Sequence, residues 1–182
     1  LWNKIDIKQD DSILRAIAER LAKDGIEVVA STSYVPELIF PQGILTRKKL
    51  TKEQKNDIVF GWKIARAMGG LDIGQCVVVR NQTVLAVEAI EGTDAAIRRG
   101  GTLGKEKAVV VKLKKPNQDL RFDLPAVGEK TIVSMLEVKA AVLAVEAGYA
   151  LFFDMESVIQ AADAAGLVVV GVTESASGEL QF

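Results

Sequence analysis

Short apolar runs dominated by valine recur along the chain, and they constrain its fold more than any other feature. The clearest are CVVV, AVVV, AVLAV and LVVVGV, which begin at residues 76, 108, 141 and 167. Runs of this length, rich in β-branched residues, are typical of strands buried in a sheet. Segments with helical spacing separate them. We therefore predict an α/β fold, mixed α+β in character, with a mostly apolar mixed sheet, flanking helices and hairpins.

The individual elements are predicted from apolar spacing and from turn residues. Helices are expected at 11–24, 51–68, 93–101, 129–140 and 155–166. The first can be capped by Asp10 or Asp11, and the second by a Thr51–Gln54 capping box. Strands are expected at 26–30, 108–115, 141–148 and 167–172, and as a hairpin within 75–92 that turns at Asn81–Gln82. Residues 149–154 are expected to return as the hairpin partner of 141–148.

The chain divides into four parts by composition and pattern. Residues 1–35 hold one helix and one strand, too little to bury a core alone, and are interpreted as the remnant of an N-terminal lobe with its own partial α/β unit. Residues 36–50 contain Pro36, Pro41 and Gly43 without a clear period, and are interpreted as a linker. The main domain is expected at 51–174, followed by a disordered tail at 175–182.

Composition excludes several classes of function. The 182 residues include no histidine and one cysteine, which argues against zinc and iron–sulfur sites and excludes Ser–His–Asp and Cys–His catalysis. A net charge of −1 and 5% aromatic residues argue against a nucleic-acid partner. No apolar stretch approaches the roughly 20 residues of a membrane span. Cys76 is expected to be a buried core thiol, and the expected location is cytoplasmic.

The first concentration of charge follows the predicted hairpin, in EAIEGTDAAIRRGG. Glu88, Glu91 and Asp94 lie within seven residues, and Thr93 is expected to cap the short helix that follows. A strand end that faces a helix N-terminus is a common place for a phosphate, because the first N–H groups of a helix attract anions. The alternative is that Asp94 only complements the helix dipole and pairs with Arg98 on the surface.

The second concentration runs from a predicted strand into a loop and comprises Lys112, Lys114, Lys115, Gln118, Asp119, Arg121 and Asp123. Lys112 and Lys114 would share one face of the strand. If residues 119–123 are extended, Asp119, Arg121 and Asp123 also share a face. Carboxylates beside a guanidinium and two lysines suit a magnesium diphosphate, which needs oxygen ligands for Mg²⁺ and cations for the phosphates. The alternative is an edge strand whose outward charges prevent aggregation.

Three long segments resemble one known family: VLAVEAIEGTDAAIRRGG, KLKKPNQDLRFDLPAVG and AVLAVEAGYALFFDMESVIQAADAAGLVVVGV. From about residue 10 to residue 172, the chain is similar to the C-terminal domain of the LpxI-type UDP-2,3-diacylglucosamine pyrophosphatases of lipid A biosynthesis. The resemblance implies a two-lobed enzyme that holds a lipid-bearing nucleotide between its lobes. It also implies Mg²⁺-dependent hydrolysis of UDP-2,3-diacylglucosamine to 2,3-diacylglucosamine 1-phosphate and UMP. Much of the N-terminal lobe of such enzymes has no counterpart in this sequence.

The resemblance also implies roles for individual residues. It makes Asp123, in the RFDLP motif, the catalytic and metal-linked carboxylate, with Asp119 as a second catalytic candidate and Glu91 as a further metal ligand. The residues it implies for substrate binding are Glu88, Gly92, Thr93, Asp94, Lys114, Gln118 and Arg121.

The expected partners follow from the same resemblance. They are a nucleotide-linked glycolipid and, through peripheral contact, the inner membrane, with no nucleic acid. Exposed hairpin edges make a homodimer a further expectation. A non-enzymatic domain that binds a nucleotide sugar or a partner protein remains the alternative function. A hydrolase and a binder differ in whether loss of Asp123 abolishes turnover while binding persists.

Overall fold

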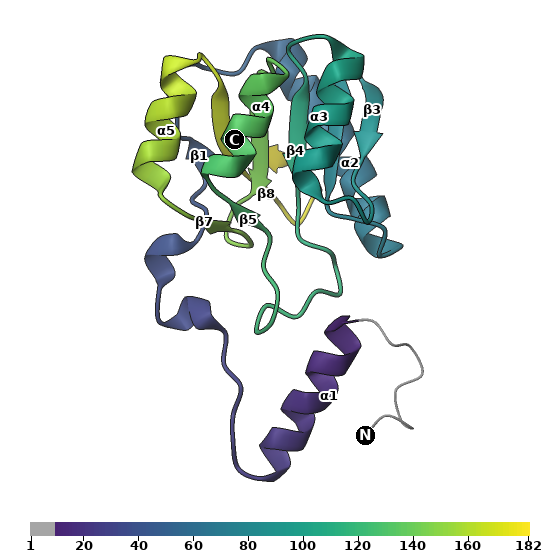
Figure 1. The fold of residues 1–182 in the computed structure, drawn as a ribbon, viewed down its shortest axis with the longest axis vertical. Helices are drawn as coiled ribbons and strands as arrows, with labels where there is room; N and C mark the ends of the chain where they lie inside the picture. The colour runs from purple at the N-terminus through teal and green to yellow at the C-terminus, as the bar shows by residue number, and fades with distance from the viewer. Residues whose placement is uncertain (1–9) are drawn as a thin grey trace.

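A computed structural model describes residues 10–182 (Figure 1). Its helices are α1 (Asp10–Lys23), α2 (Lys52–Gly70), α3 (Thr93–Gly104), α4 (Glu129–Glu137) and α5 (Met155–Ala164). Its strands are β1 (Gly43–Ile44), β2 (Cys76–Arg80), β3 (Thr83–Val87), β4 (Val109–Lys112), β5 (Ala126–Val127), β6 (Val142–Glu146), β7 (Leu151–Phe152), β8 (Val168–Glu174) and β9 (Leu180–Gln181). The side chains of Asp10 and Asp11, predicted as caps of the first helix, lie outside the described residues.

The main sheet is mixed, as predicted, with the strand order β1-β8-β6-β4-β2-β3 and β9 paired to β8. Strands β4, β6 and β8 are parallel to one another. Strand β2 is antiparallel to both β4 and β3, so β3 runs in the same direction as β4. The carboxyl ends of β3, β4, β6 and β8 therefore meet at one edge of the sheet.

Helices cover both faces of this sheet, which explains why the valine runs are apolar throughout. On one face, Val78, Val110 and Leu143 belong to a cluster that includes Ile97 of α3 and Ile132 of α4. On the other face, a second cluster joins the central strands to α2: Ile58, Trp62, Ala65, Val77, Val109, Val142 and Val168. In Figure 1, α3, α4 and α5 lie side by side over the first face, and α2 lies behind the sheet.

Elements with strong local signals form as predicted. Thr51 and Gln54 make the full capping box at the start of α2, with Gln54 N donating to Thr51 Oγ1 at 3.2 Å. The β2–β3 hairpin turns at Asn81 and Gln82, whose φ angles of 50° and 54° suit a two-residue turn. Cys76 is fully buried, and burial raises the pKa of its thiol to about 12. These residues stabilise the framework that carries the site.

Helix α3 differs from the prediction at both ends. Its N-cap is Gly92, with φ of 83°, rather than Thr93, whose hydroxyl instead donates to Glu88 Oε1 at 2.9 Å. The helix continues through Gly100 and Gly101 to Gly104, because the missing side chains let it pack closely on its neighbours. A Cβ built at Gly100 would lie 2.6 Å from Val78 Cβ, so only glycine fits there.

Two predictions about strands are wrong. Residues 26–30 form no strand, and the side chains of Ile26 and Val29 are 54% and 43% exposed. No described strand pairs with this segment, and a lone strand leaves its backbone hydrogen bonds unmade. Residues 149–154 do not fold back on 141–148. A turn at Gly148, with φ of 80°, carries the chain away, and β7 pairs in parallel with β5.

The predicted linker and tail both contribute to the sheet. Strand β1, from the linker, pairs with β8 through Gly43 and Ile44. The tail expected to be disordered contains β9, which pairs with Thr173 and Glu174 of β8. Helix α1 lies apart from the main body in Figure 1, and Arg15 Nη2 donates to Asn117 O at 3.3 Å. None of the helices within residues 10–182 is both long enough and apolar enough to cross a membrane.

Candidate functional site

Charged residues gather where the strands of the main sheet reach their carboxyl ends. Glu88 follows β3, while Lys112, Glu146 and Glu174 are the last residues of β4, β6 and β8. The first three are buried, with exposed fractions of 7%, 5% and 4%. In open α/β sheets, ligands bind beyond the carboxyl ends of the strands. This edge is therefore the candidate site.

One cavity at this edge, of about 570 Å³, is called here the Lys112 pocket. Its main lining residues come from the end of β4 and from the starts of α3, α4 and α5: Gly92, Thr93, Asp94, Lys112, Gly128, Glu129, Lys130, Thr131 and Asp154. Three predicted substrate-binding residues, Gly92, Thr93 and Asp94, thus share one pocket, which Glu91 also lines. Lys112 is the buried lysine of this pocket, and the Nζ of Lys112 donates to Ala126 O at 2.8 Å.

The two glutamates of the first group are engaged within the chain. Glu88 accepts from Thr93 Oγ1 at 2.9 Å and from Gln75 N at 3.3 Å, so it holds the start of α3 in place. Glu91 pairs with Arg99 at 2.5 Å and accepts from Ala89 N at 3.1 Å. The hydrogen bond from Arg99 is the main cause that lowers the pKa of Glu91 below its ordinary value.

The segment between β4 and β5, called the 113–125 loop, is not extended at residues 119–123. Phe122 N and Asp123 N both donate to Asp119 O, at 3.0 and 3.2 Å, so the segment turns. The prediction that Asp119, Arg121 and Asp123 share one strand face is therefore wrong. Asp119 favours the turn because its side chain accepts from Arg121 N at 3.1 Å, a local bond that competes with extended pairing.

Arg121 and Gln118 fix the two aspartates of this loop. Arg121 Nη2 lies 2.7 Å from Asp119 Oδ2, and the hydrogen bonds from this side chain lower the pKa of Asp119 to about 2. Gln118 donates through Nε2 to Asp123 Oδ2 and accepts from Lys115 N at 3.1 Å. Gln118 therefore ties the exposed Asp123 to the start of the loop.

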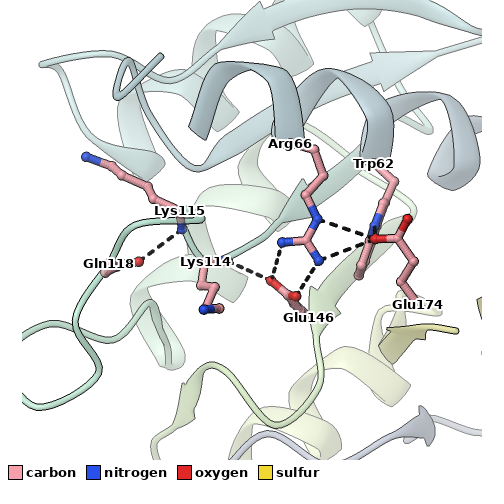
Figure 2. A network of polar contacts seen from close by, with 7 residues as sticks. All are labelled: Trp62, Arg66, Lys114, Lys115, Gln118, Glu146 and Glu174. Atoms are coloured by element: carbon pink, nitrogen blue, oxygen red, sulfur yellow. Dashed lines mark hydrogen bonds and ion pairs between the residues drawn. The ribbon is translucent and has the colours of Figure 1, made fainter. Parts of the chain in front are cut away.

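A second network at the same edge, drawn in Figure 2, was not predicted from the sequence. We call it the Glu146 network; its residues are Trp62, Arg66, Lys114, Glu146 and Glu174. Glu146 accepts from Arg66 Nη2 at 2.6 Å and from Lys114 N at 3.0 Å. Glu174 accepts from Trp62 Nε1 at 2.9 Å and lies 3.4 Å from Arg66 Nη2. The sequence does hold one signal for this network: a glutamate follows the apolar run of β6, at Glu146, and that of β8, at Glu174.

The two lysines predicted to share a strand face line different cavities. Strand β4 ends at Lys112, so the alternation of a strand does not extend to Lys114. Lys114 lines a cavity of about 480 Å³ with Arg66 and Glu146, and its Nζ lies 4.8 Å from the ring centroid of Tyr149. Both predicted groups of charge lie at the carboxyl edge. Glu91 and Asp94 of the first group line the Lys112 pocket, whereas the second group starts at Lys112 in that pocket and continues on the 113–125 loop, which projects from the edge (Figure 1).

The described residues fit a magnesium site that a single carboxylate shares with substrate phosphates, and not a site built from protein ligands alone. Across residues 10–182, no three histidine, cysteine, aspartate or glutamate side chains gather closely enough to hold a metal by themselves. Both carboxylate oxygens of Glu91 already accept hydrogen bonds. Mg²⁺ is commonly held by one or two carboxylates together with substrate phosphates and water. Asp123 is exposed and fits that arrangement as a single carboxylate ligand.

Comparisons with known proteins identify the family of the chain. The model of a family described as the LpxI C-terminal domain matches residues 41–170, a range that contains the Lys112 pocket and the 113–125 loop. The chain is similar to the UDP-2,3-diacylglucosamine pyrophosphatase LpxI of Caulobacter vibrioides, with 39% identity over 173 residues. The matched region covers 91% of this chain and 62% of that relative, so the chain spans less than two thirds of the relative's length.

Proposed function

The chain belongs to the LpxI family, and we propose on that basis that it supplies the diphosphate-cleaving part of a UDP-2,3-diacylglucosamine pyrophosphatase of lipid A biosynthesis. The products would be UMP and 2,3-diacylglucosamine 1-phosphate. The relative from Caulobacter vibrioides is named for this activity. The observation that supports the proposal most directly is the carboxyl edge of the sheet, where the Lys112 pocket adjoins the loop that carries Asp123.

The proposed reaction is an attack of water on one phosphorus of the diphosphate. Negative charge develops on the phosphoryl oxygens, and nearby N–H groups and ammonium groups stabilise it. The sequence has no histidine, so a carboxylate is the natural group to orient the water or accept its proton. We assign this role to Asp123. Bound Mg²⁺, with Asp123 as its protein ligand, would neutralise charge on the diphosphate.

The remaining predicted residues receive roles that match their contacts. Glu88 orients Thr93, so we assign Gly92, Thr93 and Asp94 to contacts with the substrate at the start of α3. Gln118 holds Asp123, and Asp119 with Arg121 stabilises the turn that presents it. Lys114 remains a candidate substrate contact. Because the substrate carries two acyl chains, we also propose that the protein works at the cytoplasmic surface of the inner membrane. A homodimer stays a prediction.

The test uses the full-length protein. We expect release of UMP from UDP-2,3-diacylglucosamine in Mg²⁺ and none in EDTA. Asp123→Ala should lower the rate by about 100-fold or more while the substrate still binds, since it removes a group that acts in the transition state. Glu106→Ala is the matched control, because Glu106 lies before β4, at the opposite edge of the sheet.

The outcomes separate the assignment from the function. Wild-type turnover in Asp123→Ala would show that the catalytic carboxylate is elsewhere. Binding of the substrate by the wild-type protein without any release of UMP would instead favour a non-enzymatic nucleotide-sugar domain.

A further inference from the structure

Lys112 carries a positive charge in a buried place. Its exposed fraction is 5%, and its Nζ donates to Ala126 O at 2.8 Å. In the part of the chain that the structure describes, no carboxylate forms an ion pair with this ammonium group. Burial of a charge without a counter-charge is costly, so such a group favours the binding of an anion. Two N–H groups of the ammonium remain available for that anion beside the bond to Ala126.

The helices around Lys112 begin without side-chain caps. Gly92 and Gly128 are the N-caps of α3 and α4, and neither helix has a hydrogen bond from a capping side chain. The first N–H groups of a helix need partners from side chains, water or a ligand. Both helix starts line the same pocket as Lys112. They add partial positive charge, directed at the ligand.

Carboxylates also line the pocket, and their positions restrict the ligand. Glu91 is neutralised by Arg99. Asp94 is half-buried, and Glu129 and Asp154 are exposed, whereas Lys112 is buried at the base. The buried part of the pocket therefore carries the Lys112 ammonium group, and its more exposed lining carries the carboxylates of Asp94, Glu129 and Asp154 beside Lys130. This arrangement suits a phosphate whose remaining charge is shared with a divalent cation at the mouth.

We propose that Lys112 and the uncapped starts of α3 and α4 form a subsite for one phosphate group of a nucleoside diphosphate. The identification of the ligand as a nucleoside diphosphate rests on the proposed function. The phosphate subsite itself is inferred from the buried ammonium group and the two helix starts. Lys112, rather than Lys114, is then the lysine that contacts phosphate at this position. Lys114 lies in the other cavity, with its ammonium over Tyr149.

Lys112 and the exposed Lys63 of α2 give a pair of lysine variants for the test. UDP binding to the full-length protein is measured by calorimetry, in EDTA and in Mg²⁺. Methionine approximates the length and volume of lysine and suits a buried position. We expect Lys112→Met to weaken UDP binding by about 10-fold or more in both buffers, since charge-assisted hydrogen bonds are lost. We expect Lys63→Met to change it by less than about 3-fold, because Lys63 lies on α2, on the other face of the sheet, and lines neither cavity. Lys112→Arg should retain part of the affinity.

A second measurement does not depend on any variant folding. Inorganic pyrophosphate is added to ¹⁵N-labelled wild-type protein, and the amide signals of Glu129 and Lys130 are followed. Shifts that saturate at these amides support the subsite. Their absence, or wild-type UDP affinity in a folded Lys112→Met variant, overturns it. Because neither readout requires turnover, a protein that binds UDP through Lys112 without releasing UMP would refute only the proposed function.

Discussion

Glu146 joins three parts of the chain through one buried carboxylate. It closes β6, pairs with Arg66 of α2 at 2.6 Å, and accepts from Lys114 N, at the start of the 113–125 loop, at 3.0 Å. We expect Glu146→Ala to destabilise the fold by roughly 2–4 kcal/mol, because Arg66 and the Lys114 amide both lose a partner. The estimate lies toward the lower end for buried pairs because Arg66 is 31% exposed. Urea denaturation measures the change.

Glu174→Ala is the matched control for this prediction. Glu174 contacts the same Arg66, but its side chain is 34% exposed and the ion-pair distance is 3.4 Å. We expect a cost of about 1 kcal/mol, mainly from the lost partner of Trp62 Nε1. Equal costs for the two variants would show that burial of Glu146 has no special effect.

At the scale of residues, the sequence predicts which side chains are buried better than it predicts which side chains contact each other. It predicts correctly that Cys76 is buried, because Cys76 lies in an apolar run. It does not predict that Arg66 meets Glu146, since 80 residues separate them and only the sheet topology brings them together. Nor does it separate Lys112 from Lys114, because that depends on where β4 ends.

At the scale of elements, the packing of α3 on α4 depends on a position without a side chain. A Cβ at Gly101 would overlap with the side chain of Val138, the residue that ends α4. Overpacking commonly costs about 1–3 kcal/mol, and the better helix propensity of alanine offsets up to about 1 kcal/mol. We therefore expect Gly101→Ala to lower the free energy of unfolding by roughly 1–2 kcal/mol, measured by urea denaturation.

Gly70→Ala provides the comparison at the end of α2. No atom lies within 4 Å of a Cβ at Gly70, so only the helix propensity acts, and we expect a neutral or slightly stabilising effect. Val138→Ala, combined with Gly101→Ala, should cost less than the sum of the two single changes, because the smaller side chain relieves the overlap. Strict additivity would contradict the proposed contact.

Elements are predictable from sequence when their cause is local. The capping box at Thr51 and the turn at Asn81–Gln82 are set by neighbouring residues, and both form as predicted. Residues 26–30 and 149–154 have strand-like sequences, but their pairing depends on distant segments. The turn at 119–123 is also not predicted from the alternating charges, because it depends on hydrogen bonds that Asp119 accepts from its own neighbours. Local signals thus give the sheet and its helices but not the shape of the loop that carries Asp123.

At the scale of the molecule, one edge of the sheet concentrates the chemistry. The parallel course of β3, β4, β6 and β8 brings Glu88, Lys112, Glu146 and Glu174 to that edge from distant parts of the chain. The opposite edge carries no predicted site residue. The Lys112 pocket and the Glu146 network flank the start of the 113–125 loop.

The folded body of the domain begins at Ile39 and Phe40, inside the segment interpreted as a linker, and Ile39 forms an antiparallel bridge with Leu151. Phe40 is fully buried and stacks on Phe152 with ring centroids 4.6 Å apart. Phe40 N donates to Ala150 O at 2.9 Å, and its carbonyl accepts from Gly148 N at 2.9 Å. We expect Phe40→Ala to destabilise the domain by about 3–5 kcal/mol, through the lost burial, the cavity and the lost aromatic pair.

Tyr34 tests whether the boundary is correctly placed, since it is an aromatic residue on the same segment and is 77% exposed. Because its ring buries little area, Tyr34→Ala should change the free energy of unfolding by no more than about 0.5 kcal/mol. Urea denaturation of this chain, with the slope compared across variants, distinguishes lost packing from a changed unfolded state. A cost at Tyr34 close to that at Phe40 would mean that the residues before Phe40 pack as part of the same cooperative unit. The expected difference would instead make the segment around Tyr34 a connection that can move without loosening the sheet or its site.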